Sequence, residues 1–204
     1  AISLGACLRE LGSDLFRQLN LAAWPEGKRP PRFGRGGVSI ATIESAERDL
    51  GFSIPPDFRY FLLNLDDPDS VFFPWSDFSI QLYRQKINRV WEGIAFDIDD
   101  GFWMRRWGNR PASSADAITI AKADFALWPP LLPIFGHRFL PAAPCQPNNP
   151  VLSIMQTDII FYGVNLAEYL IDEFVNPEPA FGVCWPGRHI DVWTDLVMGE
   201  GLEE

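Results

Sequence analysis

The chain has 204 residues, which is enough for one domain with a sizeable core and rather short for two. Its formal net charge of −10 at pH 7 argues against a nucleic-acid-binding protein, since such proteins cluster lysine and arginine on one surface. The same charge argues against binding to an anionic membrane surface. Composition therefore favours a soluble cytoplasmic protein, and the alternative is a protein that offers an acidic face to a basic partner.

The cysteines and the apolar runs agree with that compartment. Cys7, Cys145 and Cys184 are far apart and include no Cys-x-x-Cys pair, so we expect no zinc site, no redox pair and no other cofactor. No run approaches the roughly 20 apolar residues that span a bilayer. The opening residues AISLGACLRE lack the charged-then-apolar order of a signal peptide, which favours the cytoplasm.

The N-terminal region is expected to form one helix and a tether. Over residues 2–20 leucines recur at helical spacing, which predicts an amphipathic helix; they are Leu4, Leu8, Leu11, Leu15 and Leu19. The stretch WPEGKRPPRFGRGG that follows is rich in proline, glycine and arginine, which is typical of a loop. We therefore divide the chain into a helix and tether over 1–37 and a single domain over 38–204.

Two short helices with a tight joint are predicted next, over 39–50 and 56–65. Ser39 can cap the first helix, and Gly51 stands where a helix ends in the left-handed conformation. The two prolines of SIPPD suit the start of the second helix, because a missing N–H costs nothing there. Asp57 in its first turn is favourable to the helix dipole.

Alternating hydrophobicity predicts β-structure in the second half. In WEGIAFDIDDG the apolar residues at 94, 96 and 98 alternate with others, which predicts a strand. Residues 151–155 and 159–162 are two β-prone runs joined by QTD, which is typical of a hairpin. Seven prolines between residues 129 and 150 suit an extended segment or a sheet edge rather than a central strand.

A further helix is predicted over 166–175. Asn165 and Glu168 have the spacing of a capping box, and Asn176-Pro177 ends the segment. The tail PGRHIDVWTDLV is expected to add one more short element. Helices first, then strands, then a helix near the C-terminus indicate an α+β fold with a mainly antiparallel sheet.

Four segments in this order resemble the SUKH superfamily over roughly residues 38–197: AERDLGFSIPPDFRYFL, GIAFDIDDGFWMRRWGNRP, HRFLPAAPCQPNNPVLSIMQTDIIFYGVNLAEYLIDEF and HIDVWTDLV. That superfamily includes a fungal regulator of cell-wall glucan synthesis and many bacterial immunity proteins that neutralise secreted toxins. The resemblance implies one curved antiparallel sheet flanked by helices, no catalytic activity and a partner-binding face. Two turns depart from the family pattern, at Asn64-Leu65-Asp66-Asp67 and at Asn148.

The stretch GFWMRRWGNRP places two tryptophans, Trp103 and Trp107, four residues apart, so they share a side in a helix or a strand. One interpretation is a stacking platform for bases or sugar rings. The other, which we prefer, is a pair of apolar plates that close the sheet edge. In that case three arginines would pair with three aspartates, namely Arg105, Arg106 and Arg110 with Asp97, Asp99 and Asp100.

The aspartates of DIDD could instead hold a divalent cation, since they offer several hard oxygens on one strand face. The spacing of an EF-hand is absent, and no distant histidine or glutamate completes an obvious site, so we expect no metal.

A polar cluster is the remaining candidate site, and it is formed by His137, Arg138, Asp158 and Tyr162 if the proline-rich segment borders the hairpin. It could be a ligand pocket or an acid–base site. It could equally be a hydrogen-bonded tie between an irregular segment and the sheet, which we prefer because no nucleophile is evident.

These observations favour a non-enzymatic protein-binding domain, in particular an immunity protein that neutralises a basic toxin, often a nuclease, by stoichiometric binding. The alternatives are a regulator of cell-wall or glucan synthesis that acts through a protein partner, and a small-ligand binder or enzyme centred on the polar cluster. Candidate partner-binding residues are Asp66, Asp67, Asp69, Asp97, Asp99, Asp100, Trp103 and Trp107.

Overall fold

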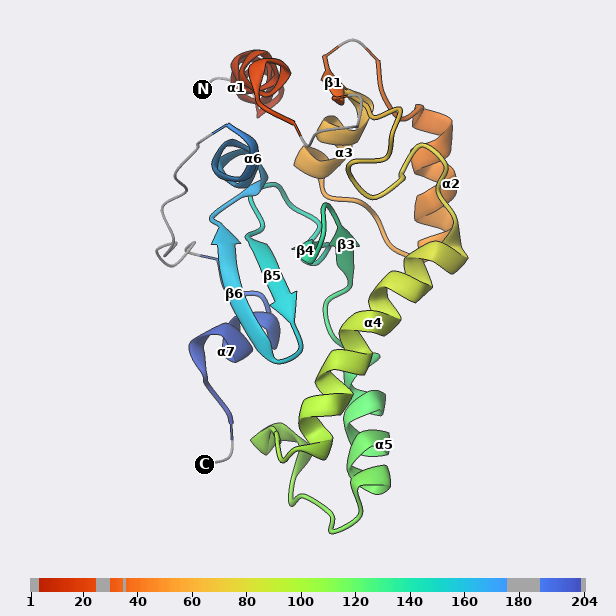
Figure 1. Cartoon of the computed structure of the whole chain (residues 1–204), viewed down its shortest axis with the longest axis vertical. Helices are drawn as coiled ribbons and strands as arrows, with labels where there is room; N and C mark the ends of the chain where they lie inside the picture. Colours follow the sequence, from red (N-terminus) through yellow and green to blue (C-terminus); the bar gives the residue numbers. More distant parts are fainter. Residues whose placement is uncertain (1–3, 25–29, 35, 176–187, 203–204) are drawn as a thin grey trace.

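The computed structural model describes residues 4–24, 30–34, 36–175 and 188–202, with side chains from residue 12 onward. Its helices in chain order are α1 (Leu4–Leu21), α2 (Ile40–Leu50), α3 (Pro56–Leu63), α4 (Ile80–Asp99), the 3-10 turn η1 (Arg105–Trp107), α5 (Ser114–Phe125), α6 (Leu166–Phe174) and α7 (Trp193–Met198). A sheet lies at mid-height of an elongated molecule, with α1, α2, α3 and α6 toward one end and α5 at the other (Figure 1). The α+β class expected from the sequence is confirmed.

The sheet consists of β3 (Leu131–Pro133), β4 (Arg138–Pro141), β5 (Val151–Met155) and β6 (Asp158–Gly163), all antiparallel and in that order. The predicted hairpin is confirmed as β5 and β6. The proline-rich segment corrects one expectation, because besides the edge strand β3 it supplies β4, an inner strand. Pro133 and Pro141 stand at the ends of these strands, where a missing N–H disturbs the ladder least.

Strand alternation divides the apolar interior into two cores, one on each face of the sheet. Leu132 and Leu140 face one core, whereas their chain neighbours Leu131 and Phe139 face the other. We call the first the phenylalanine core, because its rings include Phe16, Phe33, Phe58, Phe61 and Phe72. The second is the tryptophan core, with Trp91, Trp103, Trp107, Trp128 and Trp193.

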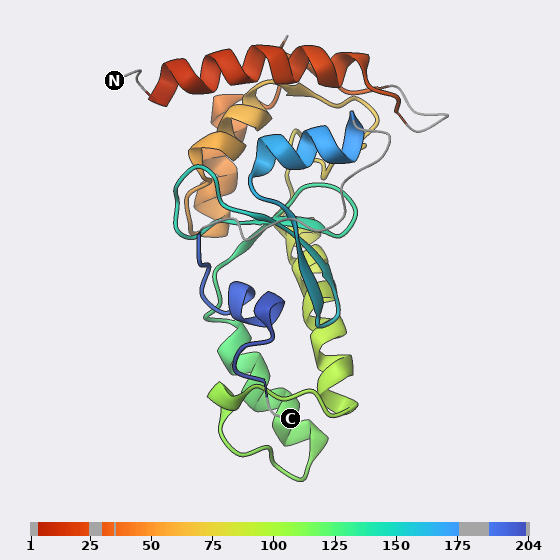
Figure 2. The same cartoon turned by 90° about the vertical axis from the view of Figure 1, so that its left-hand side faces the viewer.

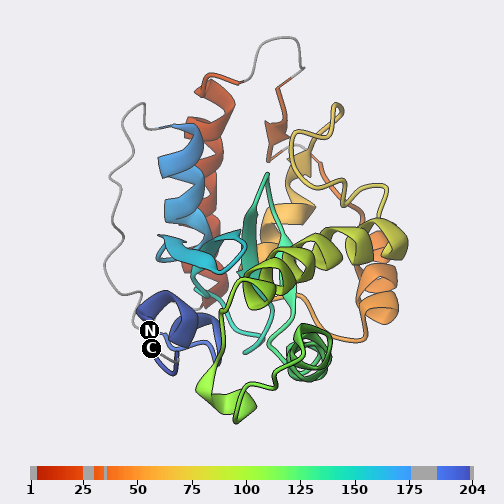
Figure 3. The same ribbon diagram turned by 60° about the horizontal axis from the view of Figure 1, so that its bottom comes forward.

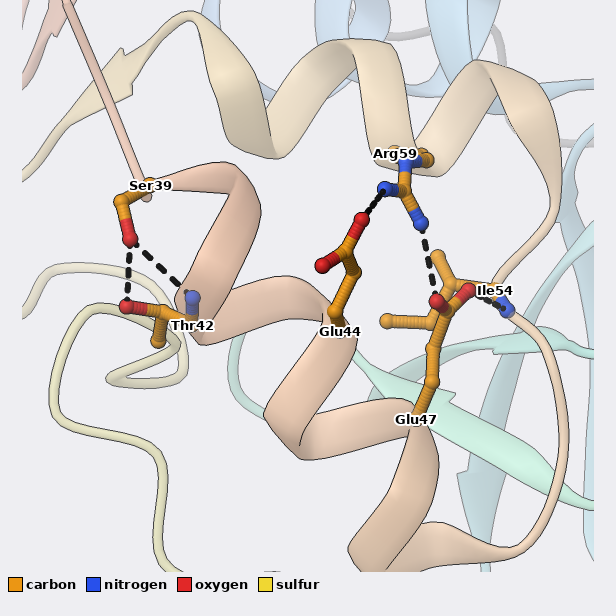
Figure 4. A network of polar contacts seen from close by, with 6 residues as sticks. All are labelled: Ser39, Thr42, Glu44, Glu47, Ile54 and Arg59. Carbon is orange, nitrogen blue, oxygen red and sulfur yellow. Dashed lines mark hydrogen bonds and ion pairs between the residues drawn. The ribbon is translucent and has the colours of Figure 1, made fainter.

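The corner between α2 and α3 shows why this part of the sequence folds as expected (Figure 4). The Ser39 hydroxyl accepts a hydrogen bond from the Thr42 amide at 3.0 Å and so caps α2. The Glu47 carboxylate accepts from the Ile54 amide at 2.8 Å and from the Arg59 guanidinium at 2.8 Å. One carboxylate thus joins the end of α2 to the start of α3 and fixes the angle between them.

The N-terminal segment packs onto this core and does not stand apart from it. Figures 2 and 3 show α6 lying alongside α1. The tether contributes β1 (Arg32–Phe33), which pairs with β2 (Leu65–Asp66) in a separate two-stranded ribbon. The Asn20 side chain exchanges two hydrogen bonds with the backbone of Phe33, at 2.9 and 3.0 Å. The division that the sequence suggested after residue 37 is therefore not a break in the packing.

The strand predicted over residues 94–98 is wrong, because these residues form the last turns of α4. The buried residues of α4 recur at helical spacing, at Val90, Trp91, Ile94 and Ile98, and this longer repeat outweighs a short alternation. Phe96, which completed the apparent strand pattern, is 64% exposed. The helix begins at the Ser79 cap and places its apolar stripe against the tryptophan core.

The tryptophan core is covered by two helices, of which one was not predicted from the sequence and the other was expected only as a short element. α5 lies beside the second half of α4 (Figures 1 and 3). The short element expected in the tail is α7, and it contacts β6. Within the described residues, no helix combines the length and the apolar character that a bilayer crossing requires.

Candidate functional site: the hairpin tip and the polar cluster

The three acidic candidates after α3 are largely engaged in holding their own loop. Asp66 forms an ion pair with Arg32 at 2.7 Å across the β1–β2 ribbon. The Asp67 carboxylate accepts hydrogen bonds from the backbone amides of Val71 and Phe72, at 3.0 and 2.7 Å. Asp69 is half-buried in the same loop. A carboxylate that already satisfies backbone amides is poorly placed to meet a partner.

The acidic candidates on α4 lie where the hairpin turn docks on the helix. The Asp97 carboxylate accepts from the Thr157 amide at 2.8 Å and from its hydroxyl at 2.6 Å. One turn earlier, Gly93 lets the chain approach closely, since a Cβ there would lie 3.0 Å from the Cα of Gln156. The tip of the β5–β6 hairpin is accordingly seen against the lower half of α4 in both views (Figures 1 and 2).

The solvent side of this joint carries apolar and acidic side chains together. Phe96, Asp99 and Asp100 stand at i, i+3 and i+4, so they share one outward face of α4. On the hairpin, Met155 pairs with Asp158, and Ile160 follows two residues later on the same strand face. The hairpin-tip patch, as we call it, consists of these six exposed residues, Phe96, Asp99, Asp100, Met155, Asp158 and Ile160.

The acids of this patch oppose the stability of the helix that carries them. Asp97, Asp99 and Asp100 occupy the last turn and the C-cap of α4, where no basic residue is present. The C-terminal end of a helix carries partial negative charge, so each exposed acid there costs roughly 0.3–1 kcal/mol. Asp97 offsets its cost through its hydrogen bonds to Thr157, whereas Asp99 and Asp100 are exposed to solvent. Residues that weaken a fold in this way are candidates for recognition.

Trp103 and Trp107 are buried, with 2% and 8% of their surfaces exposed, so they form no open stacking platform. Their rings meet edge to face at 4.9 Å. The Trp103 indole N–H donates to the Gly108 carbonyl at 2.6 Å, and that of Trp107 donates to the Asp124 carboxylate at 2.9 Å. This agrees with the structural interpretation of the pair.

The expected pairing of Arg106 and Arg110 with the aspartates at 97, 99 and 100 is wrong. Arg106 forms its ion pair with Asp124 at 3.2 Å, and Arg110 donates to the Ile98 carbonyl at 2.8 Å. Asp124 also accepts from the Trp128 indole at 2.8 Å. Sequence reasoning missed Asp124, because the contacts that make it central come from residues up to 18 positions away.

The polar cluster is assembled only in part. Arg138 is 9% exposed, contacts the imidazole of His137, and donates to the Ser153 hydroxyl at 3.2 Å. Its guanidinium carbon lies 3.6 Å from the centre of the Tyr162 ring. Asp158 does not join them; it lies on the same sheet face, but at the hairpin tip opposite Met155.

Two residues that the sequence did not single out complete this cluster. Glu173 of α6 places Oε2 3.5 Å from Nε of Arg138, an ion pair without hydrogen-bond geometry. Tyr169, one turn earlier, is fully buried, and its hydroxyl has no protein partner among the described residues. Burial and the nearby Glu173 raise the pKa of Tyr169 well above its ordinary value. The cluster connects α6 to the sheet. In the sequence, the only indication of these two residues was their i, i+4 spacing, which places Tyr169 and Glu173 on one face of a helix.

The metal hypothesis for DIDD has no supporting geometry. Asp97 is committed to Thr157, and Asp99 is two residues away on a helix, which turns it away from Asp97. Over the part of the chain that the structure describes, no group of three histidine, cysteine or acidic side chains is placed to hold a metal ion.

Comparison with family models, with curated proteins and with solved structures gave no match to this chain.

Proposed function

We propose that this chain is a non-catalytic, cytoplasmic protein-binding domain, and that its hairpin-tip patch binds a basic protein. The observation that carries the proposal is the patch itself, where the end of α4 and the hairpin docked on it together expose three apolar side chains and three aspartates. Exposed apolar groups supply contact area, and the aspartates select a partner of opposite charge.

The charge of the whole chain supports the same partner. A net charge of −10 attracts a basic protein at distances where no contact yet exists, and so raises the rate of association. The apolar side chains act later, since Phe96, Met155 and Ile160 are covered only when the partner is seated. Dissociation would then be governed by the apolar contacts, and association by the aspartates.

The resemblance to the SUKH superfamily supports a more specific form of this proposal. Many bacterial members are immunity proteins, and their toxin partners are often nucleases, which carry basic surfaces for nucleic acid. In that case the chain would neutralise a toxin by covering its basic surface, without turnover of any substrate. The partner would be encoded beside this chain.

The test is a kinetic binding measurement with candidate basic proteins encoded next to this chain. Replacing Asp99 and Asp100 together by Asn should lower the association rate about tenfold at low salt and leave the dissociation rate nearly unchanged. The matched control is Asp49→Asn with Asp77→Asn, which removes the same charge from exposed positions outside the patch. Phe96→Ala should mainly raise the dissociation rate.

The proposal fails if both double variants slow association equally, because overall charge alone would then explain the effect. An association rate that does not change between low salt and about 0.15 M salt would remove the electrostatic mechanism, since exposed charges are screened beyond about 8 Å there. Turnover of a small substrate that is abolished by His137→Ala would replace the non-catalytic proposal altogether.

A further inference from the structure

A small cavity lies away from the hairpin-tip patch, beside the N-terminal half of α4. Its volume is about 190 Å³, and it lies between α4, the loop 71–74 and the β3–β4 turn at 133–136. Pockets for drug-sized ligands are typically about 300–1,000 Å³, so this one suits a small ligand. Its walls combine aromatic side chains, such as Phe72 and Phe135, with polar groups of α4.

The polar wall of this cavity is cationic. Lys86 and Arg89 are on neighbouring turns of α4 and both line it, together with Gln85. Among the described residues that line the cavity, none carries a carboxylate. His137 and Arg138 follow directly after the lining residue Gly136, but the charge of Arg138 is already paired with Glu173 of α6.

Lys86 is held in place by two neutral groups. Its ammonium group donates to the Gly136 carbonyl at 2.5 Å and lies 5.6 Å from the centre of the Phe139 ring. Partial burial and the neighbouring Arg89 lower the pKa of Lys86, and burial, Arg138 and Lys86 lower the pKa of His137. Burial is the larger cause of both shifts, and the neighbouring cations add to it, in a chain whose net charge is −10.

From this arrangement we infer a binding site for a small organic anion, a carboxylate or a phosphate ester with a flat apolar body. Lys86 and Arg89 would hold the anionic group, because charge-assisted hydrogen bonds are the strong ones, and Arg can bind it through two N–H groups. Phe72 and Phe135 would contact the apolar body. The site is independent of the proposed protein partner.

The experiment titrates the whole protein with benzoate, phenyl phosphate and inorganic phosphate, and follows amide chemical shifts by NMR. Benzyl alcohol, which has the ring without the charge, is the neutral comparison. Saturable shifts at Gly136 and along α4 are expected for phenyl phosphate or benzoate, and which of the two binds more tightly identifies the anionic group. Benzyl alcohol should cause no saturable shift there.

Arg89→Gln should weaken binding of the preferred anion at least about tenfold, as loss of a charged hydrogen bond does. Arg84→Gln is the matched control, since Arg84 is an exposed cation of the same helix that does not line the cavity. Lys86→Gln provides a second variant, with a thermal melt to show that it folds. The inference is overturned if no anion gives saturable binding, or if Arg84→Gln and Arg89→Gln have equal effects.

Discussion

The two cores of this molecule solve the same packing problem with different side chains. In the phenylalanine core most rings are phenylalanines and meet through apolar contacts, as where Phe72 lies 5.4 Å from Phe61 and 5.3 Å from Phe174. Its one fully enclosed indole, Trp75, donates to the Pro133 carbonyl at 3.0 Å. In the tryptophan core five of the buried large rings are indoles, and each carries an N–H group that needs an acceptor when it is buried. The first core therefore depends mainly on shape, whereas the second depends on shape and on the acceptors of four indole N–H groups.

Those acceptors are supplied by two irregular segments and by Asp124 in the last turn of α5. The Trp193 indole donates to the Pro129 carbonyl at 2.8 Å, and the Trp103 indole donates to Gly108 at 2.6 Å. Trp107 and Trp128 both donate to the same oxygen of Asp124. The indoles thus fix segments that have little regular secondary structure of their own.

The largest expected effect is the removal of one ring from either core. Trp103→Ala and Phe58→Ala should each lower the free energy of unfolding by about 3–5 kcal/mol, as large-to-small core changes do. The conservative change Trp103→Phe should still cost about 1–2 kcal/mol, because the Gly108 carbonyl loses its donor. Chemical denaturation of the three variants measures this. A Trp103→Phe protein as stable as the parent would mean that the indole hydrogen bond contributes nothing.

Replacing one carboxylate should distinguish the two cores more clearly than removing a ring does. Asp124→Ala leaves two indole N–H groups and Arg106 without their acceptor, and should cost about 3 kcal/mol. Asp124→Asn keeps an acceptor oxygen and should cost less than half of that. Equal losses for the two variants would show that the charge, and not the acceptor, stabilises the tryptophan core.

The corresponding carboxylate beside the phenylalanine core should matter less. Glu47→Ala removes the acceptor of the Ile54 amide and an ion pair with Arg59, and should cost about 1–2 kcal/mol. Arg59 retains Glu44 as a neighbour at 3.6 Å and is partly exposed, so its charge is not left unpaired. A loss as large as that of Asp124→Ala would contradict the contrast between the two cores.

The smallest expected effect is an increase in stability rather than a loss. Asp99→Asn with Asp100→Asn removes unfavourable charge from the C-terminus of α4 and should raise the stability by about 0.5–1.5 kcal/mol. Asp97→Ala should lower it, because the Thr157 amide and hydroxyl lose their acceptor. Thermal melts at low salt measure both changes, and a decrease for the double variant would show that these acids stabilise the fold.

The same division between the cores explains what could be predicted from the sequence. Around the phenylalanine core, local signals decide the structure: the Ser39 cap, the Gly51 stop and the Asn165 cap all stand where expected. Around the tryptophan core, the five-residue alternation at 94–98 was mistaken for a strand, since Phe96 reaches solvent. α5 was missed because small residues such as Ala117 and Ala121 form its buried side, which gives a weak periodic signal.

The candidate sites were predicted less well than the fold, because they depend on contacts between distant segments. Asp99 and Asp100 were singled out for their charge, but nothing local indicated that Met155 and Ile160 would join them. Asp158 was assigned to the polar cluster, whereas the hairpin register places it at the tip. Glu173 reaches Arg138 from 35 positions along the chain, and no local pattern encodes that distance.

The geometry of the hairpin-tip patch depends on a residue outside it, Gly93. The turn lies so close to α4 that a Cβ at position 93 would stand 3.0 Å from the Gln156 Cα, so an alanine there would require Gln156 to shift by a few tenths of an ångström. Such a variant would alter the spacing between the two halves of the patch while leaving all six of its residues in place. A peptide copied from α4, or a hairpin copied from β5 and β6, would correspondingly be a poor mimic, because the proposed recognition surface needs both elements docked together.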